Sequence, residues 1–142
     1  MKKVLIASLL ILALCLSLFA CSSKKGGDPA VEAELSKYDF TEKDLAINEK
    51  DYIEFDEEHD LILHSTASDK EVSKAAYDAC KKVADDGVVL DYISEEPMEY
   101  SYDADGDGII HFSYTRDGEF KTLWVTSYWE EDGYTEYVIS VD

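Results

Sequence analysis

The C-terminal third of the chain alternates between apolar and polar positions with a period of two, which is typical of β-strands. The separators between the alternating runs are short and mostly rich in Asp and Gly, a composition that favours tight hairpin turns. The pattern therefore predicts an antiparallel meander. Its expected strands are 88–93, 98–102, 109–115, 119–129 and 134–141.

Two shorter runs with strand character precede this region. YIEF at 52–55 and LILH at 61–64 are joined by the polar segment DEEHD, and this arrangement predicts a second hairpin. The pattern before it is weaker, because TEKD at 41–44 resembles a helix start whereas Leu45 and Ile47 resemble a short strand.

One helix is predicted from Ser68 onward. Ser68 and Glu71 have the spacing of a capping box, in which each side chain accepts a hydrogen bond from the backbone of the other residue. Gly87 is placed to end the helix in the left-handed conformation, and Ala75 and Cys80 lie beside its buried stripe. That stripe consists of Val72, Ala76, Ala79 and Val83.

These elements predict a single α+β domain over 35–142. We expect an antiparallel sheet of five or six strands with one main helix packed on it, and the 46% hydrophobic content is high enough to form a core. Strict alternation along the long strand places two sets of side chains on opposite faces. The set expected to face the helix is Leu123, Val125 and Trp129, and the set expected on the other face is Phe120, Trp124 and Tyr128.

The N-terminus has the pattern of a targeting segment. Two lysines follow Met1, and the run Val4–Ala20 carries no charge. The run is also close to the length of a membrane-spanning helix, so an uncleaved anchor with its lysines on the cytoplasmic side is the alternative.

Residues 18–21, Leu-Phe-Ala-Cys, resemble the lipobox of bacterial lipoproteins. The resemblance implies that 1–20 is a signal peptide cut by signal peptidase II and that Cys21 carries a diacylglyceryl anchor at the outer side of the cell membrane. Signal peptidase I processing is the other alternative, although that enzyme prefers a small residue where Leu18 stands. After Cys21, the composition of 21–34 predicts a flexible tether.

The chain is strongly acidic, with a formal net charge of −19. Such a surface repels nucleic acid and favours cations and basic partners. We therefore expect no nucleic-acid partner. The expected contacts are with the membrane, through the lipid on Cys21, and with a protein or cell-wall partner. The alternative is that the acidity only keeps a tethered surface protein soluble.

One loop resembles part of an EF-hand. Asp103, Asp105 and Asp107 stand at its first, third and fifth positions, and a backbone carbonyl at Ile109 could add a calcium ligand. The bidentate glutamate of that family would stand at Tyr114, which cannot replace it. A plain Asp-Gly turn between two strands is the alternative interpretation.

Aromatic residues are dense in the C-terminal half. Exposed aromatic side chains on a rigid sheet suit partner binding, and Trp124 and Tyr128 are the expected members. The alternative is that these residues stabilise the sheet through cross-strand pairs. The group comprises Tyr92, Tyr100, Tyr102, Phe112, Tyr114, Phe120, Trp124, Tyr128, Trp129, Tyr134 and Tyr137.

The sequence does not favour catalysis, and no catalytic residue is assigned. Cys80 belongs to the helix and is expected to be buried and inert, and His59, His64 and His111 lack a metal-ligand spacing. We therefore expect a non-catalytic binding or accessory module that needs no cofactor. The alternatives are a calcium-responsive surface protein and a small cell-envelope hydrolase.

Overall fold

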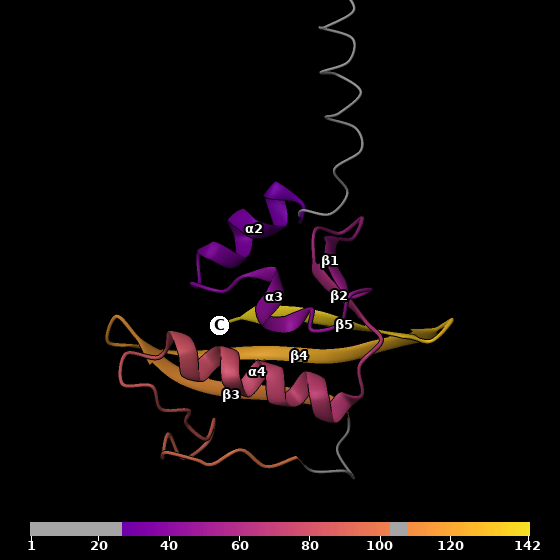
Figure 1. Ribbon diagram of the computed structural model, residues 1–142. Helices are drawn as coiled ribbons and strands as arrows, with labels where there is room; N and C mark the ends of the chain where they lie inside the picture. The colour runs from indigo at the N-terminus through magenta and orange to yellow at the C-terminus, as the bar shows by residue number, and fades with distance from the viewer. Residues whose placement is uncertain (1–26, 103–107) are drawn as a thin grey trace, which may run out of the picture.

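A computed structural model describes residues 27–102 and 108–142 (Figure 1). The sheet order is β1-β2-β5-β4-β3, and every neighbouring pair is antiparallel. The predicted α+β fold is confirmed, with a five-stranded sheet in the described chain and one main helix, α4, packed on it. The elements are α2 Pro29–Ser36, α3 Glu42–Leu45, β1 Tyr52–Phe55, β2 Leu61–Ser65, α4 Asp69–Val83, β3 Ile109–Arg116, β4 Glu119–Glu131 and β5 Tyr134–Val141.

The two faces of the sheet differ in what covers them. One face, called here the inner face, packs against the helices, and α4 lies along β3 and β4 (Figure 1). The opposite face is called the outer face. Buried inner-face side chains form the core with α2, α3 and α4, and the largest are Leu63, Phe112, Tyr114, Leu123, Tyr137 and Ile139.

The helix α4 begins as predicted but ends earlier. The Glu71 amide donates to Ser68 Oγ at 3.3 Å, and the Ser68 amide donates to Glu71 Oε2 at 2.8 Å, which completes the capping box. The last helical residue is Val83. The Asp85 amide then donates a hydrogen bond to the Thr115 carbonyl of β3 at 2.9 Å. This bond holds the chain against β3 and ends the helix before Gly87. Gly87 has φ +69° in the following turn.

The expected tether over 21–34 is wrong for its last six residues, because these lie in α2. Asp28 caps the helix by accepting from the Ala30 amide at 2.8 Å, and proline follows at the first helical position. Val31 and Leu35 are fully buried in the core. The domain therefore begins closer to Cys21 than the sequence indicated, and residues 21–26 lie outside the described residues.

The predicted strands at 88–93 and 98–102 are wrong. Leu90 makes only isolated pairings, with Pro97 and with Ser113 of β3. The Asp91 carboxylate accepts from the backbone amides two and three residues later and so forms a turn inside the expected strand. The hairpin predicted around the Asp103–Gly108 loop therefore lacks its first strand, and only β3 follows it.

A β-bulge changes the face on which Trp129 lies. Ser127 pairs with Tyr137. Glu136, the residue before Tyr137 in β5, pairs with Trp129 rather than with Tyr128. Tyr128 is therefore the extra residue, and the alternation resets after it. The expectation that Trp129 faces the helix with Leu123 and Val125 is wrong, because Trp129 lies on the outer face.

Within 27–102 and 108–142, no helix is both long enough and apolar enough to cross a membrane. The predicted anchor segment, 1–20, lies outside these ranges and stays a prediction.

Candidate functional site

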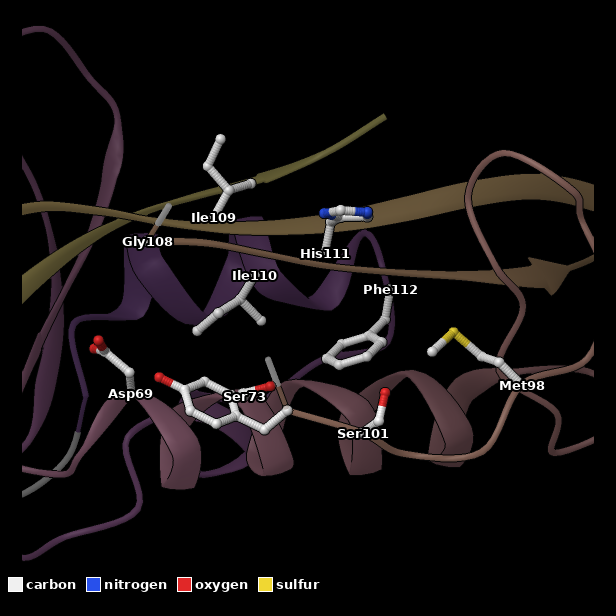
Figure 2. Close-up of a pocket in the computed structure, with 10 residues that line it drawn as sticks. Asp69, Ser73, Met98, Ser101, Gly108, Ile109, Ile110, His111 and Phe112 are labelled. Carbon is white, nitrogen blue, oxygen red and sulfur yellow. The ribbon is translucent and has the colours of Figure 1, made fainter. Parts of the chain in front are cut away.

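The outer face is the surface that the described helices leave uncovered. Side chains of β3 follow the alternation expected from the register: Ile110 and Phe112 point toward α4, whereas Ile109 and His111 point away from it (Figure 2). The same register places a set of rings on the outer face. These are Tyr52, His64, His111, Phe120, Trp124, Trp129 and Tyr134.

Four outer-face side chains form a row across four strands. Tyr52 of β1 pairs with His64 of β2, His64 pairs with Glu136 of β5, and Glu136 pairs with Trp129 of β4. Neighbouring strands lie about 4.8 Å apart, so the row spans about 14 Å. We call these four residues the cross-strand row.

His64 links the middle of the row. Its ring stacks on Tyr52 with centroids 4.4 Å apart and planes 10° apart. His64 Nε2 lies 2.9 Å from Glu54 Oε1, and His64 Nδ1 lies 3.5 Å from Glu136 Oε1. Three strands are thereby joined on this face by side chains as well as by backbone hydrogen bonds.

The predicted residue Trp124 lies in a different part of the outer face. Its ring packs against Tyr92 at 5.1 Å and His111 at 5.0 Å, and its side chain is only half-exposed. Its indole nitrogen, Nε1, is buried and has no acceptor among the described residues. Trp124 therefore stabilises the packing of Tyr92 and His111, and only part of its ring is accessible to a partner.

The structure does not bring Tyr128 together with Trp124. Tyr128 is the bulge residue, and it is 72% exposed. It lines a hollow with Asp69, at the N-terminal end of α4, and with Thr135. Sequence reasoning missed Tyr52, His64 and Glu136 as site residues, because their association depends on which strands become neighbours.

Basic residues are segregated from the outer face. No Lys or Arg between 27 and 102 or between 108 and 142 occupies an outer-face strand position. Lys121 pairs with the inner-face residue Tyr114, and Arg116 binds Asp39 at 2.8 Å and the Val83 carbonyl at 3.2 Å. The outer face carries Glu54, Glu131 and Glu136, and no Lys or Arg at a described strand position on that face compensates their charge.

The structure describes one of the four predicted calcium ligands. Asp103, Asp105 and Asp107 lie outside the described residues, and Ile109 is the exposed first residue of β3. No group of three His, Cys, Asp or Glu side chains in the described part of the chain is arranged to hold a metal. Calcium binding by the loop stays a prediction, and so does lipidation of Cys21.

A small cavity of about 200 Å³ lies between α4 and β3 (Figure 2). Asp69, Ser73, Met98 and Phe112 contribute to its lining. The Tyr137 hydroxyl donates to the Asp69 carboxylate, and burial, together with this bond, raises the pKa of Tyr137. This bond fixes the first turn of α4 to β5.

Cys80 lies in the core, as the sequence predicted. Its side chain is fully buried, and its sulfur lies 3.7 Å from the Phe112 carbonyl oxygen. Burial strongly raises the pKa of this thiol, which disfavours the nucleophilic thiolate. Tyr114, at the position of the absent EF-hand glutamate, is also fully buried and packs edge-on against Phe40 at 6.0 Å.

No protein-family model matches the chain, and neither the curated proteins nor the solved structures give a significant match. The site must therefore be interpreted from its own geometry.

Proposed function

We propose that this chain is a lipid-anchored lipoprotein that acts outside the cell membrane as a non-catalytic binding module. The partner, a protein or a cell-wall component, contacts the outer face of the sheet. The observation that carries the proposal is the exposed part of the outer face, which presents the rings of Tyr52 and Trp129 and the carboxylates of Glu54 and Glu136 on paired strands.

The lipid anchor rests on the Leu-Phe-Ala-Cys sequence at 18–21. Two acyl chains give stable attachment to a bilayer. Pro29, at the start of α2, is eight positions after Cys21, and an extended chain of eight steps reaches at most about 28 Å. The proposed anchor therefore keeps the domain near the membrane surface, where its partner is also expected.

Binding through the outer face rests on exposure and residue type. Trp129 and Tyr52 are 59% and 42% exposed, respectively, even though they belong to paired strands. Tryptophan and tyrosine supply a large share of the binding energy at protein interfaces. Tyr52 lies on β1, which pairs with β2, and Trp129 lies on the part of β4 that pairs with β5. The backbone beneath each ring is therefore ordered before a partner binds, which lowers the entropy cost of binding.

The anchor is tested by replacing single cysteines in the predicted signal region. Cys21→Ala should abolish the lipid mass and move the protein out of the membrane fraction. Cys15→Ala is the matched control, because Cys15 lies in the segment proposed to be removed, and it should leave both properties unchanged. Normal lipidation of the Cys21→Ala protein would contradict the anchor.

The binding face is tested by replacing both exposed rings, Tyr52→Ser with Trp129→Ser, and comparing cross-linked complexes recovered from intact cells. The double variant should lose its complexes while its melting temperature and abundance stay close to wild type. Tyr128→Ser is the control, because it removes a ring at the bulge that is more exposed than either of these two. Undiminished complexes in the double variant would contradict binding through this face.

A further inference from the structure

We propose that the cross-strand row, together with Glu54, binds a basic, extended polypeptide segment of the partner. This inference rests on the proposed function and adds the chemistry of the contact. Lysine or arginine side chains of the segment would contact the carboxylates of Glu54 and Glu136 and the rings at the two ends of the row.

The carboxylates have hydrogen-bonding capacity that His64 cannot fill. An imidazole has at most two N–H donors, whereas each of the two carboxylates that flank it has about four acceptor sites. The shorter contact, 2.9 Å, is with Glu54, whereas the contact with Glu136 is 3.5 Å. The side chains of Glu54 and Glu136 are 52% and 29% exposed, so a partner's ammonium or guanidinium group can reach both.

The rings at the two ends favour the same kind of ligand. A lysine or arginine side chain over a tryptophan or tyrosine ring is attracted by the negative face of the ring. Trp129 and Tyr52 present exposed rings beside the two carboxylates. A cationic side chain between a ring and a carboxylate would make both contacts at once.

The dimensions of the row suit an extended chain. A row of about 14 Å is crossed by about four to five extended residues, since each advances about 3.3 Å. Side chains on the same side of such a segment are about 7 Å apart, so two basic residues would lie over the row together.

The charge distribution favours a basic segment over the other partners. The chain has a formal net charge of −19, and the described outer-face strand positions carry no Lys or Arg. A neutral wall sugar would gain no charge attraction from the carboxylates, and an anionic polymer would be repelled. The carboxylates of Glu54 and Glu136 are therefore the feature that distinguishes a basic segment from the other ligands.

The test uses the full-length protein in uncharged detergent and follows tryptophan fluorescence during titration with hexalysine. The row variant, Glu54→Gln with Glu136→Gln, should weaken binding at least tenfold. The matched control, Glu49→Gln with Asp78→Asn, removes the same charge from an exposed loop residue and from α4, and it should change affinity by less than twofold. Trp129→Ser should weaken hexalysine binding in the same direction as the row variant.

Two further titrations separate the alternatives. Hexaglutamate should not bind, and a neutral hexasaccharide of N-acetylglucosamine should bind far more weakly than hexalysine. Equal loss in the row variant and the charge-matched control would overturn the inference, because it would reduce binding to general attraction by an acidic surface. Sugar binding that requires Tyr52 and Trp129 but neither carboxylate would also overturn it, while leaving the outer face as the binding surface.

Discussion

Trp129 lies directly across from Glu136 on the outer face, although Ser127, two residues earlier, lies across from the core residue Tyr137. The single extra residue Tyr128 produces this change. Without the bulge, Trp129 would share the inner face with Leu123 and would require burial against α4. The bulge thus completes the cross-strand row and removes a large ring from the core.

Deleting Tyr128 should preserve this relationship. The deletion leaves Ser127 opposite Tyr137 and Trp129 opposite Glu136, so no other side chain changes face. We expect a loss of about 1 kcal/mol in the free energy of unfolding, measured by urea denaturation. Deleting Val138 is the control, because β5 has no extra residue there, and the deletion forces one of its core neighbours, Tyr137 or Ile139, to the other face. Comparable damage from the two deletions would contradict the register.

Gly108 is constrained by the same bulge. It has φ +77°, its carbonyl accepts from the Ser127 amide at 2.8 Å, and an added Cβ would overlap Ser127 Oγ. Gly108→Ala should therefore destabilise the fold by about 2–4 kcal/mol, combining left-handed strain with this overlap.

The controls for this prediction are Gly118→Ala and Gly133→Ala. Both glycines have positive φ with open space around the missing Cβ, so each should lose only about 1 kcal/mol by strain. Adding Ser127→Ala to Gly108→Ala should recover the part caused by overlap. Equal losses of stability in Gly108→Ala, Gly118→Ala and Gly133→Ala, measured by thermal or urea unfolding, would contradict the prediction. They would show that the close approach of Ser127 to Gly108 does not affect stability.

The stability should depend on pH through Asp51. Burial favours the neutral form of this carboxyl, but bonds from the Thr66 and Asn48 amides and the Ser65 hydroxyl outweigh it and lower its pKa. A lowered pKa stabilises the fold above about pH 4, the unfolded value, and the contribution is lost as pH falls through the folded pKa.

Asp51→Asn should therefore lower the free energy of unfolding by about 1–2 kcal/mol at pH 7 and flatten the loss of stability that the wild type shows as the pH falls below about 4. Urea unfolding at several pH values measures both effects. The comparison variant is Asp78→Asn, which alters an exposed carboxylate of α4 and should keep the acid slope of the wild type. An unchanged acid slope in Asp51→Asn would contradict the prediction.

Cys80 should resist thiol reagents in the native protein. Its sulfur is buried between α4 and β3, and its raised pKa keeps it protonated at neutral pH. The chain carrying Cys15→Ala and Cys21→Ala should show no fast-reacting thiol when folded and one in denaturant. Ala75→Cys, in the same background, supplies a partly exposed reference on the same helix. Rapid native labelling of Cys80 would contradict its place in the core.

Local sequence signals predicted those elements whose stabilising contacts are local. The Ser68 cap, the hairpin of β1 and β2 and the β3–β4–β5 meander each follow from residues near one another in the chain. The helix α2 was missed, although Asp28 and Pro29 form a start signal and Val31 and Leu35 are four residues apart. Its apolar pattern is too short to distinguish a helix from a tether, and only the core shows that Val31 and Leu35 are buried.

The remaining errors arose where tertiary contacts override the pattern. The apolar run at 88–93 has strand composition, but Asp91 turns the chain and Pro97 limits pairing. The bulge at Tyr128 has no signature in a run that alternates regularly. The cross-strand row depends on β2 pairing with β5, two strands separated by about 70 residues, which no local pattern specifies.

The most direct test of partner binding is site-specific photocross-linking of the full-length protein in intact cells. Benzoylphenylalanine in place of Tyr52 or Trp129 should give the same cross-linked product, and that product should disappear when Glu54→Gln and Glu136→Gln are added. The same group in place of Asp78, on the exposed side of α4, should give none. A product from position 78 with none from positions 52 and 129 would contradict binding through the outer face.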